Sequence, residues 1–190
     1  MSQTLHTASL GRSIATGAIG FAVVSLCVFA TVAFGERWLY RTLGVYGAYG
    51  AWTVLFIVLS GLVFGSLVHG RWRLPRFYLL WTVAFFAYAI AWMIAYFVLG
   101  RTTGELVGSL AGSVLMALVL AAGFRALRSI VKLSLVIFIG NALGYFLGAA
   151  IFNANPTQTG MLLFGVLYGL FFGAAIGAVL HSLQHDSLRA

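Results

Sequence analysis

Charge is scarce in this chain. Only 7% of its 190 residues are Asp, Glu, Lys or Arg, against roughly 25% in a typical soluble domain. Hydrophobic residues make up 62%. A surface with so few charges would not stay dissolved in water, so the composition excludes an ordinary soluble protein and predicts one that is surrounded by lipid.

Acidic residues and cysteine are also rare, and each shortage excludes a class of site. The three acids, Glu36, Glu105 and Asp186, lie at the ends of apolar runs or in the tail, so we expect no paired-carboxylate catalytic site. The one cysteine, Cys27, excludes both a disulfide framework and a zinc cluster of cysteines. Because Cys27 lies in an apolar run, we expect it to be buried as a small hydrophobic residue. The chain has no Gly-x-Ser-x-Gly motif, and we expect it not to be an enzyme.

The chain has only two prolines, and long apolar runs precede and follow each of them. A membrane-spanning helix needs about 20 mostly apolar residues, and six runs meet this requirement: 13–35, 45–69, 77–99, 104–124, 130–152 and 160–183. Pro75 and Pro156 are expected between these spans, because proline cannot donate a helical hydrogen bond. The sequence therefore predicts an all-α polytopic membrane protein, a compact bundle of six transmembrane helices that forms a single transmembrane domain over residues 1–190.

Basic residues predict how the bundle is oriented. The formal net charge of +8 would suggest a nucleic-acid partner in a soluble protein; here we expect membrane lipid as the partner and no nucleic acid. Three basic residues fall on one side of the six-span arrangement: Arg37, Arg41 and Arg101. The other side holds Arg12, Arg71, Arg73, Arg76, Arg125, Arg128, Lys132 and Arg189. The positive-inside rule places that second side, with both termini, in the cytoplasm. We expect the membrane to be a prokaryotic cytoplasmic (inner) membrane.

Small residues recur at four-residue spacing in several spans. Lipid gives helices no hydrophobic reason to associate, so they associate by close packing, which small residues four apart permit. We interpret the series as a glycine zipper that serves helix packing; the alternative is that it lines a narrow pathway, or contacts other membrane subunits or a second copy. The glycines concerned are Gly61, Gly65, Gly104, Gly108, Gly112, Gly140, Gly144, Gly148, Gly165, Gly169, Gly173 and Gly177.

The first span carries a shorter series, Ala18 and Ala22. In size and topology the chain resembles the substrate-binding component of energy-coupling-factor vitamin transporters. Those proteins pack a small-xxx-small face of the first span against a coupling subunit. The resemblance implies that Ala18 and Ala22 form the matching pair here.

No span has an ionisable residue near its centre, although ion-driven transporters usually do. The most central strongly polar side chain is Asn141, and the hydroxyls of Tyr145 and Tyr168 lie deep enough to bond to it or to a ligand. We therefore predict a ligand site at these three residues, towards the outer half of the membrane. The site would take a neutral or apolar small solute without a cofactor, and the predicted function is transport-associated.

Two alternatives stay open. The first is a non-catalytic accessory or scaffold subunit of a larger membrane complex. A cavity separates the two hypotheses: a transporter should have a polar-lined pocket, and a scaffold should have a filled interior with small-residue faces open to lipid. The second is a metal- or haem-binding protein, because His181 and His185 lie one helical turn apart and His69 is predicted at the same end.

Glu105 is explained by local structure. Thr102 and Glu105 fit a helix capping box at the outer start of the run 104–124.

Overall fold

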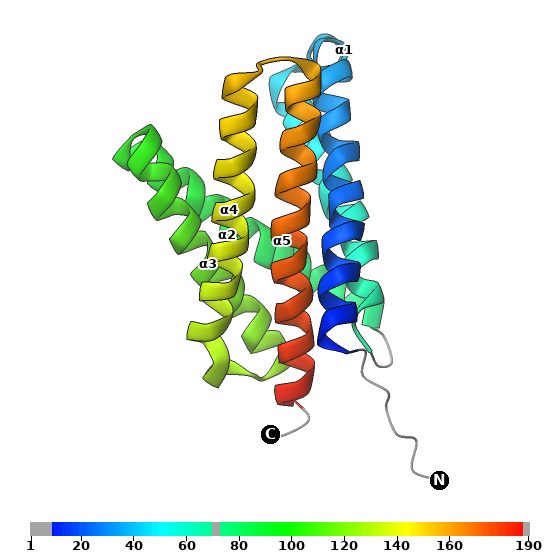
Figure 1. Ribbon diagram of the computed structural model, residues 1–190, viewed down its shortest axis with the longest axis vertical. Coiled ribbons are helices and arrows are strands. Elements are labelled where there is room, and N and C mark those ends of the chain that lie inside the picture. Colours follow the sequence, from blue (N-terminus) through cyan, green and yellow to red (C-terminus); the bar gives the residue numbers. More distant parts are fainter. Residues whose placement is uncertain (1–8, 70–72, 188–190) are drawn as a thin grey trace.

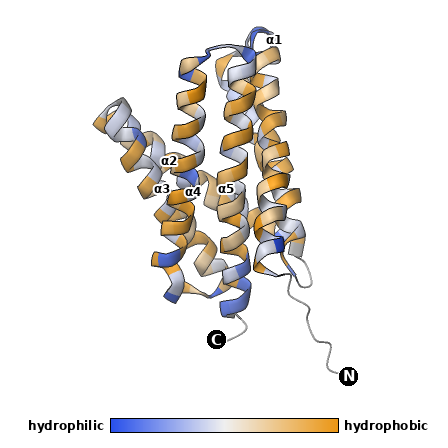
Figure 2. Ribbon diagram, viewed as in Figure 1, coloured by the Kyte–Doolittle hydropathy of each residue, from blue (hydrophilic) through white to orange (hydrophobic). Residues whose placement is uncertain are grey.

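The protein is built almost entirely from long helices. The computed structural model describes residues 9–69 and 73–187, so Arg71 and Arg189 of the predicted basic side lie outside the described residues. The elements are α1 (Leu10–Ser66), α2 (Arg73–Leu99), α3 (Arg101–Phe124), the short 3-10 helix η1 (Leu127–Ser129), α4 (Ile130–Ala154) and α5 (Gln158–Ser187). Five of these helices are long and apolar enough to cross a membrane. They indicate a multi-pass membrane protein, with hydrophobic residues along the middle of the helices (Figure 2).

Helix α1 reverses direction partway along its 57 residues. Gly44 has φ 67° and ψ 179°, a conformation that essentially only glycine adopts. The rings of Phe21, before Gly44, and Phe64, after it, stack with centroids 5.1 Å apart. Helix α1 is therefore two packed arms, 10–43 and 45–66, that meet at Gly44 (Figure 1). The first arm continues through Glu36 and Arg41, where the apolar run has already ended.

The reversal gives a first testable prediction. Gly44→Ala should lower the melting temperature of the detergent-solubilised protein by a few degrees, because an alanine at this φ and ψ costs about 1–3 kcal/mol and a change of 1 kcal/mol is worth about 2–4 °C at this chain length. Gly50→Ala is the matched control, since Gly50 is helical and has nothing within 4 Å of an added Cβ. Equal melting temperatures for the two variants would show that Gly44 is not required for the reversal.

The helices form two groups. Helix α5 packs against α1 and α4, and α2 packs against α3. The α2–α3 pair leans away from the other helices towards its connecting end at Gly100 (Figure 1). Helix α3 packs on α4 and α2 packs on α1, but within the described residues α2 has no close backbone approach to α4 or α5. Side chains fill only part of the space between α2 and the helices α1, α4 and α5.

The predicted glycine series lie at contacts between these helices. A Cβ added at any of the twelve would come within 3.0 Å of a heavy atom on a neighbouring helix. The series in α3 faces α2, the series in α4 faces α5, and the series in α5 faces the first arm of α1. In the second arm, Gly61 and Gly65 face side chains of α2. These small-residue faces are therefore occupied within the chain and are not open to lipid.

The first-span pair has a partner inside the chain. A Cβ added at Gly169 of α5 would meet the Cα atom of Ala22 at 2.5 Å, and Ala22 is buried. Ala18 is half-buried. The face that the vitamin-transporter resemblance assigns to a coupling subunit is thus packed, at Ala22, against α5.

Exposed apolar side chains cover the outside of the bundle. On the first arm of α1, Ile19 is 65% exposed and Val23 is 57% exposed, which is expected of side chains that face lipid. Cys27 is exposed as well. The prediction that Cys27 is buried is wrong, because an apolar run in a spanning helix supplies its lipid-facing side as well as its packed side.

Two predictions about helix ends are also wrong. Helix α3 begins at Arg101 with Gly100 as its N-cap residue, and the Gly104 N–H donates to the Gly100 carbonyl at 2.7 Å, so Thr102 lies inside the first turn and does not cap it. Pro75 lies in the first turn of α2, not between spans; the first turn has no partner for its N–H groups, so proline costs little there. Pro156 does separate α4 from α5, as predicted.

Candidate ligand cavity

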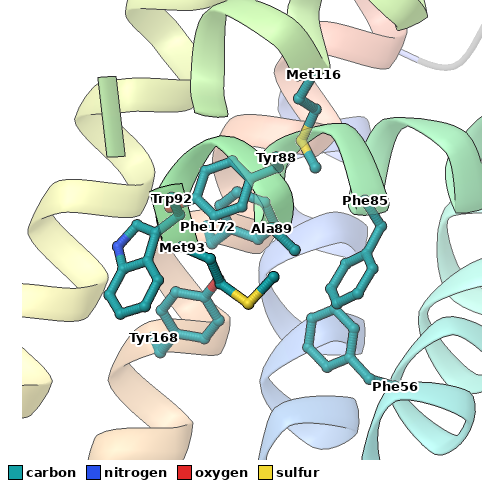
Figure 3. Close-up of a pocket in the computed structure, with 9 residues that line it drawn as sticks. All are labelled: Phe56, Phe85, Tyr88, Ala89, Trp92, Met93, Met116, Tyr168 and Phe172. Carbon is teal, nitrogen blue, oxygen red and sulfur yellow. The ribbon is translucent and has the colours of Figure 1, made fainter. Parts of the chain in front are cut away.

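Two adjoining cavities lie between α2 and the group formed by α1, α4 and α5. The first, which we name the aromatic cavity, has a volume of about 180 Å³. Figure 3 shows the side chains that line it. Its lining residues are Phe56, Phe85, Tyr88, Ala89, Trp92, Met93, Met116, Tyr168 and Phe172. The second, the amide cavity, has a volume of about 230 Å³ and is lined by Phe29, Tyr88, Trp92, Asn141, Tyr145, Phe164 and Tyr168. Tyr88, Trp92 and Tyr168 line both cavities, so the two are neighbours.

Polar groups from four helices meet beside the amide cavity. Asn141 of α4 is only 2% exposed. The Tyr168 hydroxyl of α5 donates to Asn141 Oδ1 at a long 3.5 Å. The Tyr88 hydroxyl of α2 lies near the side chains of Asn141 and Ser109, and among the described residues the buried Ser109 Oγ makes no hydrogen bond of good geometry. Buried polar atoms that are weakly paired or unpaired can bond to a ligand that enters the cavity.

Aromatic rings form the walls, and their contacts with one another fix their positions. Tyr168 and Phe172, one turn apart on α5, stack with centroids 5.5 Å apart and planes 7° apart. Tyr145 and Phe164 meet edge to face at 5.9 Å. Trp92 stacks on Tyr96 at 4.9 Å. Because neighbouring rings hold these side chains, the cavity walls are preformed.

The structure places the three predicted ligand residues, Asn141, Tyr145 and Tyr168, around the amide cavity. Whether they bind a ligand stays a prediction. Sequence reasoning missed Tyr88 and Trp92, which line both cavities from α2. Their spacing of one helical turn was visible in the sequence, but apolar and aromatic residues surround them on every side of α2.

Glu105 was missed for a different reason. The sequence pattern assigned it to a helix cap, but the half-buried Glu105 side chain lies beside the Tyr145 hydroxyl. Its carboxylate is therefore next to a residue that lines the amide cavity. Neither cavity has an ionisable acid or base among its lining residues, apart from tyrosine hydroxyls.

No family model, curated protein or solved structure matches this chain. The function of the cavities therefore has to be inferred from their own geometry and chemistry.

The three histidines of the metal or haem hypothesis, His69, His181 and His185, lie elsewhere, at the end of the bundle that holds the last turns of α5. The His69 N–H donates to Gln184 Oε1 at 3.0 Å, and His69 Nδ1 lies 3.0 Å from the same oxygen. The Gln184 amide in turn donates to the Leu67 carbonyl, which ties the end of α1 to α5. The rings of His181 and His185 are 6.1 Å apart. Among the described residues no group of three or more His, Cys, Asp or Glu side chains is placed to hold a metal ion.

Proposed function

We propose that this protein binds a neutral or apolar small molecule in the two adjoining cavities, as a transport-associated protein that passes the molecule through the helical bundle. The observation that carries the proposal is Asn141: its buried amide, 2% exposed, lines a cavity whose other walls are aromatic. Ligand sites typically combine apolar walls with a few placed polar groups. The arrangement is thus that of a ligand site with one polar contact region.

The lining residues favour a particular ligand chemistry. Stacked aromatic walls suit a flat, unsaturated molecule. Asn141 and the hydroxyls of Tyr88 and Tyr168 suit one or two hydrogen-bonding groups, such as a carbonyl or a hydroxyl. The lining contains no Lys, Arg, Asp or Glu to balance an ion. Because pockets for drug-sized ligands measure roughly 300–1,000 Å³, cavities of about 180 and 230 Å³ favour a smaller solute.

We further propose six membrane crossings with both ends of the chain in the cytoplasm. The two arms of α1 support this, because each is at least as long as the about 20 residues that a crossing requires. The start of α1 and the end of α5 lie at the same end of the bundle (Figure 1). Three basic residues, Arg125, Arg128 and Lys132, lie where the chain passes from α3 into α4. The positive-inside rule assigns such a cluster to the cytoplasm, and we propose that the membrane is a prokaryotic inner membrane.

The accessory-subunit hypothesis has less support. It expects small-residue faces that remain open for other subunits, but the glycine series in α3, α4 and α5 each face a neighbouring helix of the same chain. It also expects a filled interior, and two cavities are present.

Native mass spectrometry tests the proposal. The protein is extracted in mild detergent from its own membranes, and we expect a small molecule to be retained at fixed stoichiometry. Ala89→Phe should fill the aromatic cavity, and Asn141→Leu should remove the buried amide with little change in volume; both should lower ligand occupancy about tenfold, the effect of losing roughly 1.4 kcal/mol of binding. The matched control is Ile90→Phe, which enlarges a neighbouring side chain on α2 that is 49% exposed and should leave occupancy unchanged.

Two outcomes would count against a binding role. Wild-type protein that retains no small molecule, but stays associated with larger membrane subunits, would support the accessory-subunit hypothesis. A retained molecule whose occupancy is the same in all three variants would place the ligand outside these cavities.

A further inference from the structure

A separate cavity lies at the end of the bundle where α3 passes through η1 into α4. Its volume is about 750 Å³. Arg125, at the end of α3, and Arg128, within η1, line it together with Ser129 and Asp186. It shares no residue with the aromatic or amide cavity.

The charges in this cavity are unevenly paired. The Ser129 hydroxyl donates to Asp186 Oδ2 at 2.7 Å, so the carboxylate is held on that side. Arg125 and Arg128 are both exposed, and within the described residues neither guanidinium group has a hydrogen-bond or ion-pair partner. Two cationic side chains and one anionic side chain leave the cavity with a net positive charge.

The backbone supplies a second, independent observation. Arg125 has φ 59°, and in the described residues it is the one residue other than glycine with a positive φ. Glycine is the usual residue for a left-handed position that ends a helix. Arginine is the less favourable choice for the backbone, and within the described residues its guanidinium group forms no hydrogen bond or ion pair that would compensate. A ligand outside the chain would supply such a partner.

The surroundings identify what that use is. Apolar residues flank the two arginines, and an exposed stripe at helical spacing runs from η1 along α4, with Leu127 53%, Val131 70% and Leu135 51% exposed. Guanidinium groups bind phosphate oxygens in a bidentate way. Basic pockets at the cytoplasmic ends of spanning helices suit phospholipid head groups. A soluble phosphate compound would have no use for the apolar stripe.

We infer that this cavity binds the head group of an anionic phospholipid, one whose net charge is −1. Arg125 and Arg128 hold the phosphodiester, and the acyl chains lie along the Leu127–Val131–Leu135 stripe. Asp186 disfavours a second negative charge on the head group and can accept a hydrogen bond from a head-group hydroxyl. The inference does not depend on the ligand proposed for the other cavities.

Native mass spectrometry in detergent again gives the test, now as a lipid titration. Phosphatidylglycerol is compared with phosphatidylcholine of the same acyl chains, and wild-type protein should bind phosphatidylglycerol about 10–30-fold more tightly, because each basic residue near the membrane surface contributes roughly 1 kcal/mol. Arg125→Gly combined with Arg128→Gln should abolish the preference. Arg125→Gly alone should weaken it without lowering the melting temperature, since glycine accepts the left-handed backbone.

The matched control removes the same amount of charge away from this cavity, near residue 43, where the first arm of α1 ends. Arg37→Gln combined with Arg41→Gln takes away two exposed arginines that do not line the cavity, and the preference for phosphatidylglycerol should remain. Equal binding of the two lipids by wild-type protein, or an equal loss in the control, would overturn the inference. Millimolar inorganic phosphate that displaces phosphatidylglycerol would also overturn it and point to a soluble phosphate ligand.

Discussion

Gly173→Ala should lower the melting temperature of the detergent-solubilised protein by about 5–10 °C. A Cβ at Gly173 would collide with the Gly17 carbonyl oxygen and with Phe21 Cβ of α1. The carbonyl belongs to a helix backbone and cannot rotate away, so α1 and α5 would have to separate. Overpacking of this kind costs about 1–3 kcal/mol, and 1 kcal/mol corresponds to roughly 2–4 °C for a chain of this length.

Gly35→Ala is the matched control for this experiment. Gly35 lies in the first arm of α1, and nothing lies within 4 Å of an added Cβ. Alanine has a higher helix propensity than glycine, so this variant should melt at the wild-type temperature or slightly above it. Both variants are heated in the same detergent, and the fraction that stays monodisperse in size-exclusion chromatography is followed. If both lose stability equally, close packing of α1 on α5 is not what Gly173 provides.

Trp81→Ala should destabilise the protein still more, by about 3–5 kcal/mol, the usual cost of deleting a buried aromatic side chain. Trp81 of α2 is 0% exposed and packs against α1. Its ring meets Phe64 at 5.0 Å and Phe77 at 6.1 Å. Its Nε1–H donates to Ser60 Oγ at 2.8 Å, and the Ser60 hydroxyl donates to the Phe56 carbonyl at 2.6 Å. The alanine variant loses the packing and this connection together.

Trp81→Phe separates those two losses, because phenylalanine keeps an aromatic ring and removes only the N–H donor. We expect it to cost about 0.5–1.5 kcal/mol for the hydrogen bond, plus the smaller ring. Trp38→Ala is the control, since Trp38 is 66% exposed and should leave the free energy of unfolding nearly unchanged. Unfolding is measured by titration with a denaturing detergent. A Trp38→Ala variant as unstable as Trp81→Ala would show that burial of the tryptophan side chain is not the cause of the lost stability.

Much of the helix pattern could be predicted from hydropathy, because long uncharged runs leave no other structure that satisfies backbone hydrogen bonds in lipid. The runs 77–99 and 130–152 fall within α2 and α4 and differ from them by a few residues at the ends. Hydropathy could not show that the first arm continues to residue 43, since a helix that leaves the membrane stays helical while its residues become polar. It also could not show that Cys27 faces outward, because lipid accepts the same residues as a packed interior.

The candidate site could be predicted only in part, and for a similar reason. Asn141 was visible because an amide within an apolar run is exceptional. Tyr88 and Trp92 were not, since α2 is rich in aromatic residues throughout. Glycine spacing identifies a packing stripe but carries no information on which helix covers it. The pairing of Gly173 with Gly17 therefore had to come from the structure.

The packing of α1 on α5 has a consequence for biogenesis. The Gln158 side chain donates to the Ala33 carbonyl across 125 residues of sequence, and Gly17 and Ala22 meet their partners on the same late helix. The first arm is synthesised long before α5 exists. Its close-packing stripe must remain in contact with lipid or with the insertion machinery during that interval. The contact between the first arm and α5 therefore forms late, and an insertion intermediate that lacks α5 would hold the first arm against the second arm, with its close-packing stripe uncovered.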